Sequence, residues 1–320
     1  MSENLSSRIC PVCLSKVSRE YNRISNAKQM KILITGGTGY IGTTLVPYLQ
    51  ERGYNDICLL VRSKTKAQGI YADAVQYIST ENLEWRNQIE EYDPEVVIHL
   101  AGLLNSKHDA ESVEPIVNSN VLFTTQLLEA VSHTQCKYFV NVGSCWEYRD
   151  GGTNPNPNTL YAATKLAVHP IISFYQSISH WKWVNVVVYS AYGKRNVPKK
   201  IFELLYDALD APTPLPFTEG NQVLDFIHVE DIADFFYTLM CKLEVITDNY
   251  TQFHLGTGEG HSLREVASVL EEITGKKVNA VWGALPYRPH EVMKSIAPIA
   301  ENIRLLGWKS TKSIRDGWGG

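Results

Sequence analysis

Tyr161 and Lys165 stand four residues apart in a stretch predicted to be helical, and positions i and i+4 of a helix share one face. A protonated lysine beside a phenol favours the phenolate, so we expect Lys165 to lower the pKa of Tyr161 towards the working pH. Tyr161 can then exchange a proton with a substrate oxygen, and Ser144, at the end of an earlier strand, can hydrogen-bond that oxygen. These three residues form the predicted catalytic group. Because the Tyr-x-x-x-Lys spacing also arises by chance, its meaning depends on the elements around it.

A glycine-rich turn is the first of those elements. An apolar strand at 31–35 runs into three glycines spaced three residues apart, and a helix follows at 43–51. In such a turn the first glycine permits a sharp bend, the second lets the backbone approach a pyrophosphate, and the third lets helix and strand pack closely. The unpaired N–H groups of the helix N-terminus favour the phosphates. A plain structural turn is the alternative, but the strand and helix favour a dinucleotide site, whose predicted contacts are Gly36, Gly39, Tyr40, Ile41 and Gly42.

The residues after the second predicted strand, 56–61, bear on the choice between NAD and NADP. An acidic residue about 20 positions after the glycines would hold the ribose 2′-hydroxyl of NAD, whereas an arginine would accommodate the 2′-phosphate of NADP. The chain has Val61 and then Arg62 there, with Lys64 and Lys66 nearby. We therefore predict that Arg62 contacts the cofactor and that NADP(H) is preferred. A solvated basic loop would look the same, so NAD(H) stays an alternative.

Further apolar strands are predicted at 95–102 and 137–142, with a helix at about 112–132 between them. Such near-continuous apolar runs are typical of parallel strands covered on both faces. Alternating strands and helices predict a right-handed parallel sheet whose chemistry lies at the carboxyl ends of the strands. Ala101 and Gly102, at one such end, are small enough for a nucleotide to lie against the backbone. His99, inside the strand, is expected to be a core histidine.

Charge and hydropathy exclude several classes of protein. The chain has 320 residues, a formal net charge of -4 and no basic patch typical of nucleic-acid or acidic-membrane binding. No apolar stretch approaches the roughly 20 residues of a membrane span, and the first residues do not resemble a secretory signal. We therefore expect a cytoplasmic protein with neither nucleic acid nor membrane as a partner.

The first 29 residues are polar and lack clear periodicity, so a flexible N-terminal tail is expected there. Cys10 and Cys13 have the spacing of half a zinc site, but no second Cys or His pair follows at a matching distance, and no metal is predicted. The remaining cysteines lie in apolar surroundings typical of buried free thiols: Cys58, Cys136, Cys145 and Cys241.

Together these motifs resemble the extended short-chain dehydrogenase/reductase family, in the branch of NAD-dependent epimerases and dehydratases that act on nucleotide sugars. The resemblance extends over about residues 30–320. It rests on the segments 36–42, 99–102, 144–148, 161–165, 192–193, 225–231 and 306–308.

The resemblance implies an α/β fold. A Rossmann-type doubly wound parallel sheet would occupy 30–190, and a smaller C-terminal α/β substrate lobe 191–320, from which about 223–257 would return to the Rossmann domain. It implies that Ser144, Tyr161 and Lys165 are the catalytic triad, with Lys165 also holding the nicotinamide ribose, and that the protein is a homodimer. Further cofactor contacts implied by it are Leu100, Ala101, Gly102 and Tyr189.

Departures from the family pattern narrow the expected reaction. The 4,6-dehydratases of the family have Thr-Asp-Glu where this chain has Ser144, Cys145 and Trp146, so the acid and base needed to remove water are absent. Epimerases usually carry an acid after the second strand, whereas Arg62 fits a reductase that exchanges NADPH. The segments 143–146 and 158–165 look most like 4-ketoreductases of nucleotide-linked deoxyhexoses, such as the CDP-paratose and CDP-abequose synthases.

Substrate contacts are predicted at Ser144 and Cys145 and at basic residues of the C-terminal lobe. Lys199, Lys200 and Arg288 are candidates to neutralise a diphosphate, although a solvated surface would have the same composition. The sequence thus predicts an NADPH-dependent reductase of a nucleotide-linked 4-keto-6-deoxy sugar, in deoxysugar biosynthesis. The alternatives are a nucleotide-sugar 4-epimerase with tightly bound NAD and, more distantly, a non-catalytic dinucleotide sensor.

Overall fold

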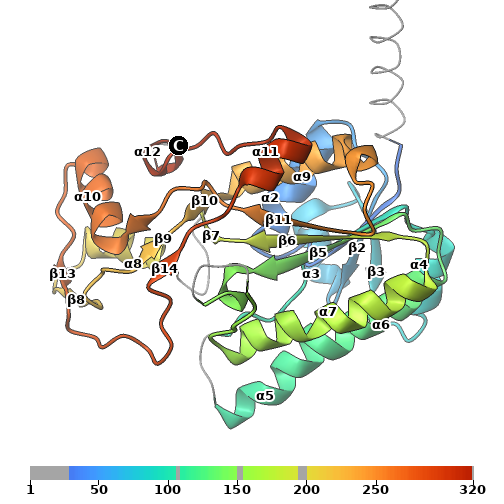
Figure 1. Ribbon diagram of the computed structural model, residues 1–320, viewed down its shortest axis with the longest axis horizontal. Helices are drawn as coiled ribbons and strands as arrows, with labels where there is room; N and C mark the ends of the chain where they lie inside the picture. The colour runs from blue at the N-terminus through green and yellow to red at the C-terminus, as the bar shows by residue number, and fades with distance from the viewer. Residues whose placement is uncertain (1–28, 106–108, 150–153, 194–199, 319–320) are drawn as a thin grey trace, which may run out of the picture.

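The computed structural model describes residues 29–105, 109–149, 154–193 and 200–318. The tail predicted at 1–29, with Cys10 and Cys13, lies outside these residues apart from Gln29, and so does Lys199. The chain forms a large sheet domain flanked by helices and a smaller lobe, at the left of Figure 1, built mainly from the C-terminal third of the chain.

A parallel sheet of seven strands is the centre of the fold, in the order β11-β6-β5-β4-β1-β2-β3. The strands are short and almost wholly buried, as the apolar runs predict. Their bounds are β1 Ile32–Thr35, β2 Ile57–Val61, β3 Gln76–Ser79, β4 Val96–His99, β5 Tyr138–Ser144, β6 Lys182–Val188 and β11 Tyr250–Leu255.

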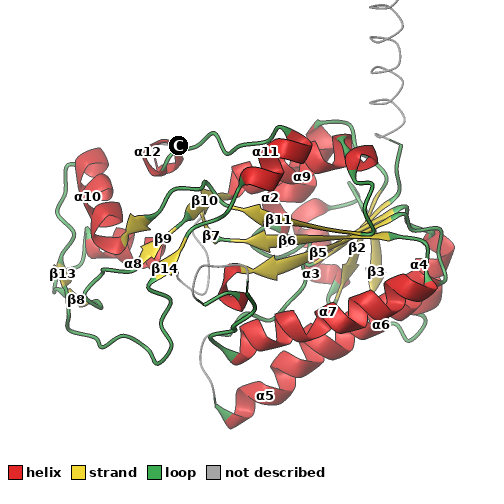
Figure 2. Cartoon of the chain, in the orientation of Figure 1, coloured by secondary structure: helices red, strands yellow, loops and turns green. Residues whose placement is uncertain are grey.

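Helices cover both faces of this sheet (Figures 1 and 2). Because successive side chains of a strand point to opposite faces, Ile32 and Ile34 join one apolar core while Leu33 joins the other. The first core is covered by α2 Gly42–Glu51, α3 Lys64–Tyr71, α9 Val229–Cys241 and α11 Ala300–Leu306. The second is covered by α4 Trp85–Tyr92, α6 Phe123–Ser132 and α7 Leu160–Ile178.

The helix predicted at about 112–132 is longer and less regular than its periodicity suggests. It begins at α5 Ala110–Val117, where Asp109 and Ser112 form a capping box. It then passes through a π-helical turn, η1 Asn118–Leu122, before α6. Such π turns are frequently found at functional sites.

The smaller lobe has its own apolar core, to which Tyr192, Phe202 and Leu270 belong. It contains a parallel pair, β7 Ser190–Tyr192 and β10 Phe226–His228, and further short strands and helices. In contrast, α9 and β11 lie with the large sheet. The remaining elements of the lobe are α8 Ile201–Ala208, β8 Leu215–Pro216, β9 Val223–Leu224, β12 His261–Ser262, α10 Leu263–Thr274, β13 Ala280–Val281, β14 Lys294–Ser295 and α12 Ile314–Trp318.

The predicted fold class is therefore confirmed: an α/β, Rossmann-type doubly wound parallel sheet with a smaller C-terminal α/β lobe. Within the described ranges, no helix is both long enough and apolar enough to span a bilayer.

Candidate active site

The glycine-rich turn joins β1 to α2 as predicted, and two of its glycines are required by its geometry. Gly36 has a φ of +70°, and a Cβ there would lie 2.7 Å from the amide nitrogen of Ala101. A Cβ at Gly42 would lie 2.5 Å from the carbonyl oxygens of Gly36 and Gly37. The first glycine thus makes the bend and the last permits the close approach of helix and strand.

The N-terminus of α2 suits an anion. Ile41, at the N-cap, offers no side chain to the first-turn N–H groups, and the first turn holds no acidic residue. Thr43 N and Thr44 N already donate to Gly39 O and Ile41 O, so the helix dipole is the feature that favours negative charge at the turn. A dinucleotide pyrophosphate fits this polarity.

His99 is a core residue, as predicted. It is 1% exposed, and its Nδ1 and Nε2 lie 2.7 Å and 2.9 Å from the hydroxyl oxygens of Thr35 and Thr124. Burial, and secondarily the charge of Lys165, lower the pKa of His99 to about 3, so the ring stays neutral. Thr35 also accepts a hydrogen bond from Ala101 N at 3.1 Å, which ties the ends of β1 and β4 together.

The structure brings Ser144, Tyr161 and Lys165 together at the carboxyl end of β5. Ser144 is the last residue of β5, Tyr161 lies in the first turn of α7, and Lys165 follows one turn later. The hydroxyl of Ser144 lies near enough to the phenol of Tyr161 to lower its pKa. Lys165 is buried beneath Gly102, where an added Cβ would lie 3.5 Å from its Nζ. The predicted proton-transfer residues and a predicted cofactor-side residue therefore share one site.

The electrostatics of this cluster differ from the sequence-based expectation in one respect. The pKa of Tyr161 is raised, first by burial and then by the negative charge of Glu147, and the nearby Ser144 hydroxyl opposes the shift. The lowering that we expected from Lys165 is therefore not found, because burial penalises the phenolate. Burial also lowers the pKa of Lys165 to about 8, against the influence of Glu147.

Two polar residues of the site were missed from the sequence. Glu147 is fully buried, and its Oε1 accepts a hydrogen bond from Ser144 N at 2.7 Å. Asn120, in the π turn, accepts a hydrogen bond from Leu103 N at 2.7 Å and donates one to Thr164 Oγ1 at 3.0 Å. Glu147 stands between Trp146 and Tyr148, which was the available signal, whereas Asn120 follows the polar residues Asn118 and Ser119 and had no such signal.

The predicted contacts on the cofactor side occupy different environments. Arg62 is exposed just beyond β2, beside the end of β1 that enters the glycine-rich turn. Tyr189 is buried, with its hydroxyl 3.2 Å from His254 Nδ1. Lys200, one of the predicted diphosphate contacts, lies against this turn instead: its Nζ is 4.0 Å from the ring centroid of Tyr40 and donates to Ala191 O at 3.3 Å. Burial lowers the pKa of Lys200.

The two other predicted substrate contacts, Cys145 and Arg288, differ in exposure. Cys145 is buried in an apolar cluster with Tyr148 and Tyr189, and burial raises the pKa of its thiol to about 12. Arg288 is exposed, and its backbone N–H donates to the Glu291 carboxylate at 3.4 Å. Among the described residues, no group of three or more His, Cys, Asp or Glu side chains could hold a metal ion.

Asp225 and Asp231, in the segment at 225–231, fasten the lobe and the chain end to the sheet domain. Asp225 accepts hydrogen bonds from Thr257 N and Gly258 N at 2.8 and 2.9 Å, and Asp231 accepts one from Lys312 N at 2.9 Å. Both carboxylates are buried and saturated with backbone donors. These two carboxylates therefore stabilise the fold.

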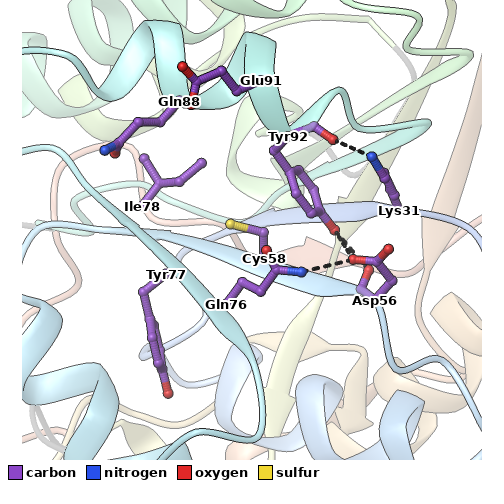
Figure 3. A pocket seen from close by; sticks show the side chains of 9 residues that line it. All are labelled: Lys31, Asp56, Cys58, Gln76, Tyr77, Ile78, Gln88, Glu91 and Tyr92. Atoms are coloured by element: carbon purple, nitrogen blue, oxygen red, sulfur yellow. Dashed lines mark hydrogen bonds between the residues drawn. The ribbon is translucent and has the colours of Figure 1, made fainter.

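A cavity of about 350 Å³ lies away from this site, at the amino ends of β1, β2 and β3 (Figure 3). There Tyr92 Oη donates to Asp56 Oδ1 at 3.1 Å, and Lys31 Nζ donates to Tyr92 O at 3.0 Å. Since ligands of doubly wound sheets bind at the carboxyl ends of the strands, this cavity is not the candidate active site.

Comparison with known proteins identifies the family. The family model described as the NAD dependent epimerase/dehydratase family matches residues 32–252. The chain is 25% identical over 264 residues to the CDP-abequose synthase of Yersinia pseudotuberculosis, covering 82% of this chain and 91% of that protein. It is 28% identical over 328 residues to UDP-glucose 4-epimerase 2 of Arabidopsis thaliana, covering 89% and 92%.

Among solved structures, the UDP-glucuronic acid 4-epimerase of Bacillus cereus, in complex with UDP-glucuronic acid and NAD, superimposes with a TM-score of 0.77 at 25% identity, covering 90% of this chain and 96% of that one. The resemblance inferred from the sequence motifs is confirmed. Because the family model spans more than half of the chain, the protein is an enzyme that belongs to the NAD dependent epimerase/dehydratase family.

Proposed function

We propose that this enzyme reduces the C4 carbonyl of a nucleotide-linked 4-keto-6-deoxy sugar with NADPH. The observation that carries the proposal is the cluster of Ser144, Tyr161 and Lys165 at the carboxyl end of β5, with Lys165 beneath Gly102. The similarity to CDP-abequose synthases of two bacteria supports the choice of a deoxysugar reductase.

The roles of the three side chains follow from their chemistry. The dinucleotide, when bound, supplies the hydride that reduces the carbonyl carbon. Tyr161 donates its proton to the carbonyl oxygen, so the ketone becomes an alcohol and a phenolate remains. Ser144 donates a hydrogen bond to that oxygen as negative charge develops on it. Lys165, when protonated, stabilises the phenolate and favours proton release from Tyr161.

Cofactor binding rests on the glycine-rich turn and on the neighbouring strand ends. The N-terminus of α2 would hold the pyrophosphate, and Ala101 and Gly102 would let the nucleotide lie against the backbone. Arg62 favours NADP(H), because a guanidinium can pair with a 2′-phosphate. The related structures that contain NAD support NAD(H) as the other choice.

A nucleotide-sugar 4-epimerase that retains NAD is the second candidate. It is favoured by the relatives named UDP-glucose 4-epimerase, at up to 28% identity. Such an enzyme would oxidise and then reduce its substrate at the same Tyr161. Mass spectrometry of the denatured protein discriminates between the two: released NAD(H) favours the epimerase, whereas an empty or NADP-loaded site favours the reductase.

Replacement of Tyr161 tests the catalytic assignment. Tyr161→Phe removes the proton donor and leaves the glycine-rich turn unchanged, so turnover should fall by about 10²-fold or more with cofactor affinity retained. Tyr77→Phe, on the edge strand β3, is the matched control and should behave as the wild type. Wild-type turnover by the Tyr161→Phe variant would remove Tyr161 from its role.

We also propose a homodimer. Apolar side chains on the helical layer formed by α5, η1 and α7 are 38% to 61% exposed, and a second copy of the chain would cover them. They are Val113, Val117, Leu122, Phe174 and Ile178. Light scattering on the purified protein tests this, and a monomeric mass at micromolar concentration would contradict it.

A further inference from the structure

Behind the proton-transfer cluster lies a second pair of titratable side chains, Glu147 and His169. Tyr161, Lys165 and His169 follow one another at intervals of four residues along α7, so they form one stripe on the helix. At the end of this stripe, His169 Nε2 lies 3.4 Å from Glu147 Oε2. Glu147 is 0% exposed and His169 only 16%. Neither of these two buried atoms forms a hydrogen bond within the described part of the chain, so each lacks a polar partner beyond this close approach.

The other oxygen of Glu147 reaches the backbone of the active site. Glu147 Oε1 accepts a hydrogen bond from Ser144 N at 2.7 Å, which closes a capping box over η2 Cys145–Glu147. Gly143 makes room for it, because a Cβ at Gly143 would lie 2.8 Å from Oε1. The carboxyl group therefore binds the backbone of Ser144 through one oxygen and lies 3.4 Å from the imidazole of His169 with the other.

The surroundings of Glu147 contain titratable groups on three elements. Lys165 and His169 face it from α7, Tyr148 and Cys145 lie in or beside η2, and Tyr250 approaches from β11. Lys165 is a cation among them and lowers the pKa of Glu147, and the charge of Glu147 in turn affects Lys165 and Tyr161. The protonation state of Glu147 thus changes the electrostatic environment of both Tyr161 and Lys165.

Burial sets the protonation state of the pair. It raises the pKa of Glu147 to about 7 and lowers the pKa of His169 to about 4. Between these values the carboxylic acid is neutral and the imidazole is neutral, so the acid can donate its proton in a hydrogen bond to Nε2. This arrangement avoids the cost of an unpaired buried charge.

We propose that Glu147 and His169 share one proton and act as a positioning pair that sets the pH range over which Tyr161 and Lys165 transfer protons. The inference rests on the proposed function of Tyr161. Below neutral pH the carboxyl group of Glu147 is protonated, so it places no negative charge near Tyr161. As pH rises the proton leaves to solvent, and the carboxylate then holds Lys165 protonated but makes Tyr161 a weaker acid.

Glu147→Gln separates this role from a purely structural one. The amide oxygen can still accept from Ser144 N, and the amide group can still donate to His169, so the variant imitates the protonated form at every pH. In the wild type, reductive turnover should fall by about threefold or more as pH rises through the titration of Glu147. Glu147→Gln should lack this fall, and Glu90→Gln, on the exposed face of α4, should retain it.

A spectroscopic measurement keeps the inference testable without any substrate. The infrared difference between wild type and Glu147→Gln should contain the C=O band of a protonated carboxylic acid at about pH 5.5, and the band should disappear by about pH 8.5. His169→Phe, which keeps an aromatic ring against Trp183, should shift this band because the hydrogen-bond acceptor is lost.

Each outcome decides a separate claim. Absence of the acid band over this whole pH range, or a band unaffected by His169→Phe, would overturn the shared proton. If the band titrates but turnover has the same pH profile in wild type and in Glu147→Gln, the coupling to Tyr161 is overturned. If no sugar is turned over at all, the proposed function fails, while the infrared band still decides whether the pair exists.

Discussion

Glu147→Gln should change how the stability of the protein depends on pH, because Glu147 is a fully buried carboxyl group. Burial raises its pKa from an ordinary 4.5 to about 7 in the folded state. A folded pKa above the unfolded one means that the folded state holds the proton more tightly. The stabilisation is then fully present below about pH 4.5 and is lost as pH rises through about 7.

The size of the loss follows from the shift. A difference of about 2.5 pKa units at 1.36 kcal/mol per unit corresponds to about 3 kcal/mol of unfolding free energy. His169 contributes with the opposite sign, because its pKa is lowered to about 4 and its stabilisation is lost as pH falls. The imidazole is present in both proteins, so comparing wild type with Glu147→Gln isolates the carboxyl group.

The assay is equilibrium unfolding in urea, followed by tryptophan fluorescence at several pH values from about 4.5 to 8. Relative to Glu147→Gln, the wild type should lose about 3 kcal/mol of unfolding free energy over this range. Glu90→Gln replaces an exposed carboxyl group and should run parallel to the wild type. Parallel curves for wild type and Glu147→Gln would refute the reasoning, because they would mean that Glu147 titrates alike in the folded and unfolded states.

Two further substitutions test the cofactor side. Gly42→Ala should destabilise the protein by about 1–3 kcal/mol and weaken dinucleotide binding, because the added Cβ would meet two carbonyl oxygens at 2.5 Å. Calorimetry measures both the stability and the binding. An unchanged melting temperature would contradict the packing argument. Arg62→Ala should weaken NADPH binding by about tenfold while NADH binding changes little, since an exposed charged contact to a 2′-phosphate contributes about 1–2 kcal/mol. Equal effects on the two cofactors would show that Arg62 does not determine the preference for NADPH over NADH.

The elements that carry strong local signals could be predicted from the sequence. The turn from Gly36 to Gly42 has the geometry expected from its glycine spacing, and the apolar runs at 95–102 and 137–142 form β4 and β5. Ser262 and Glu265 have the spacing of a capping box, and the structure forms one, with Glu265 N donating to Ser262 Oγ at 3.1 Å. In each case the determining interactions lie within a few residues of one another.

Elements determined by distant partners could not be predicted in this way. The stretch at 223–229, the first part of the segment expected to return to the Rossmann domain, divides into β9, β10 and the start of α9. Asp225 lies at the division, where its carboxylate accepts hydrogen bonds from Thr257, Gly258 and Ala297, which are far away in sequence. Apolar periodicity contains no information about such partners.

The candidate site, too, could be predicted only in part from the sequence. The spacing of Tyr161 and Lys165 and the strand end at Ser144 were sufficient to place three residues together. Burial was not readable from spacing, so the raised pKa of Tyr161 was unexpected and Glu147 was missed. Whether an acid beside a strand end faces solvent or lies under the site depends on packing by α7 and β11, which only the folded chain reveals.

Reduction of a 4-keto sugar is the central claim, and NADPH oxidation tests it most directly. The purified protein should be incubated with CDP-, dTDP- and GDP-linked 4-keto-6-deoxy sugars while the absorbance of NADPH is followed. The proposal predicts stoichiometric loss of NADPH with at least one sugar for the wild type, and a rate about 10²-fold lower for Tyr161→Phe. No loss with any of them, together with NAD released on denaturation and interconversion of a UDP-sugar with its C4 epimer, would contradict it.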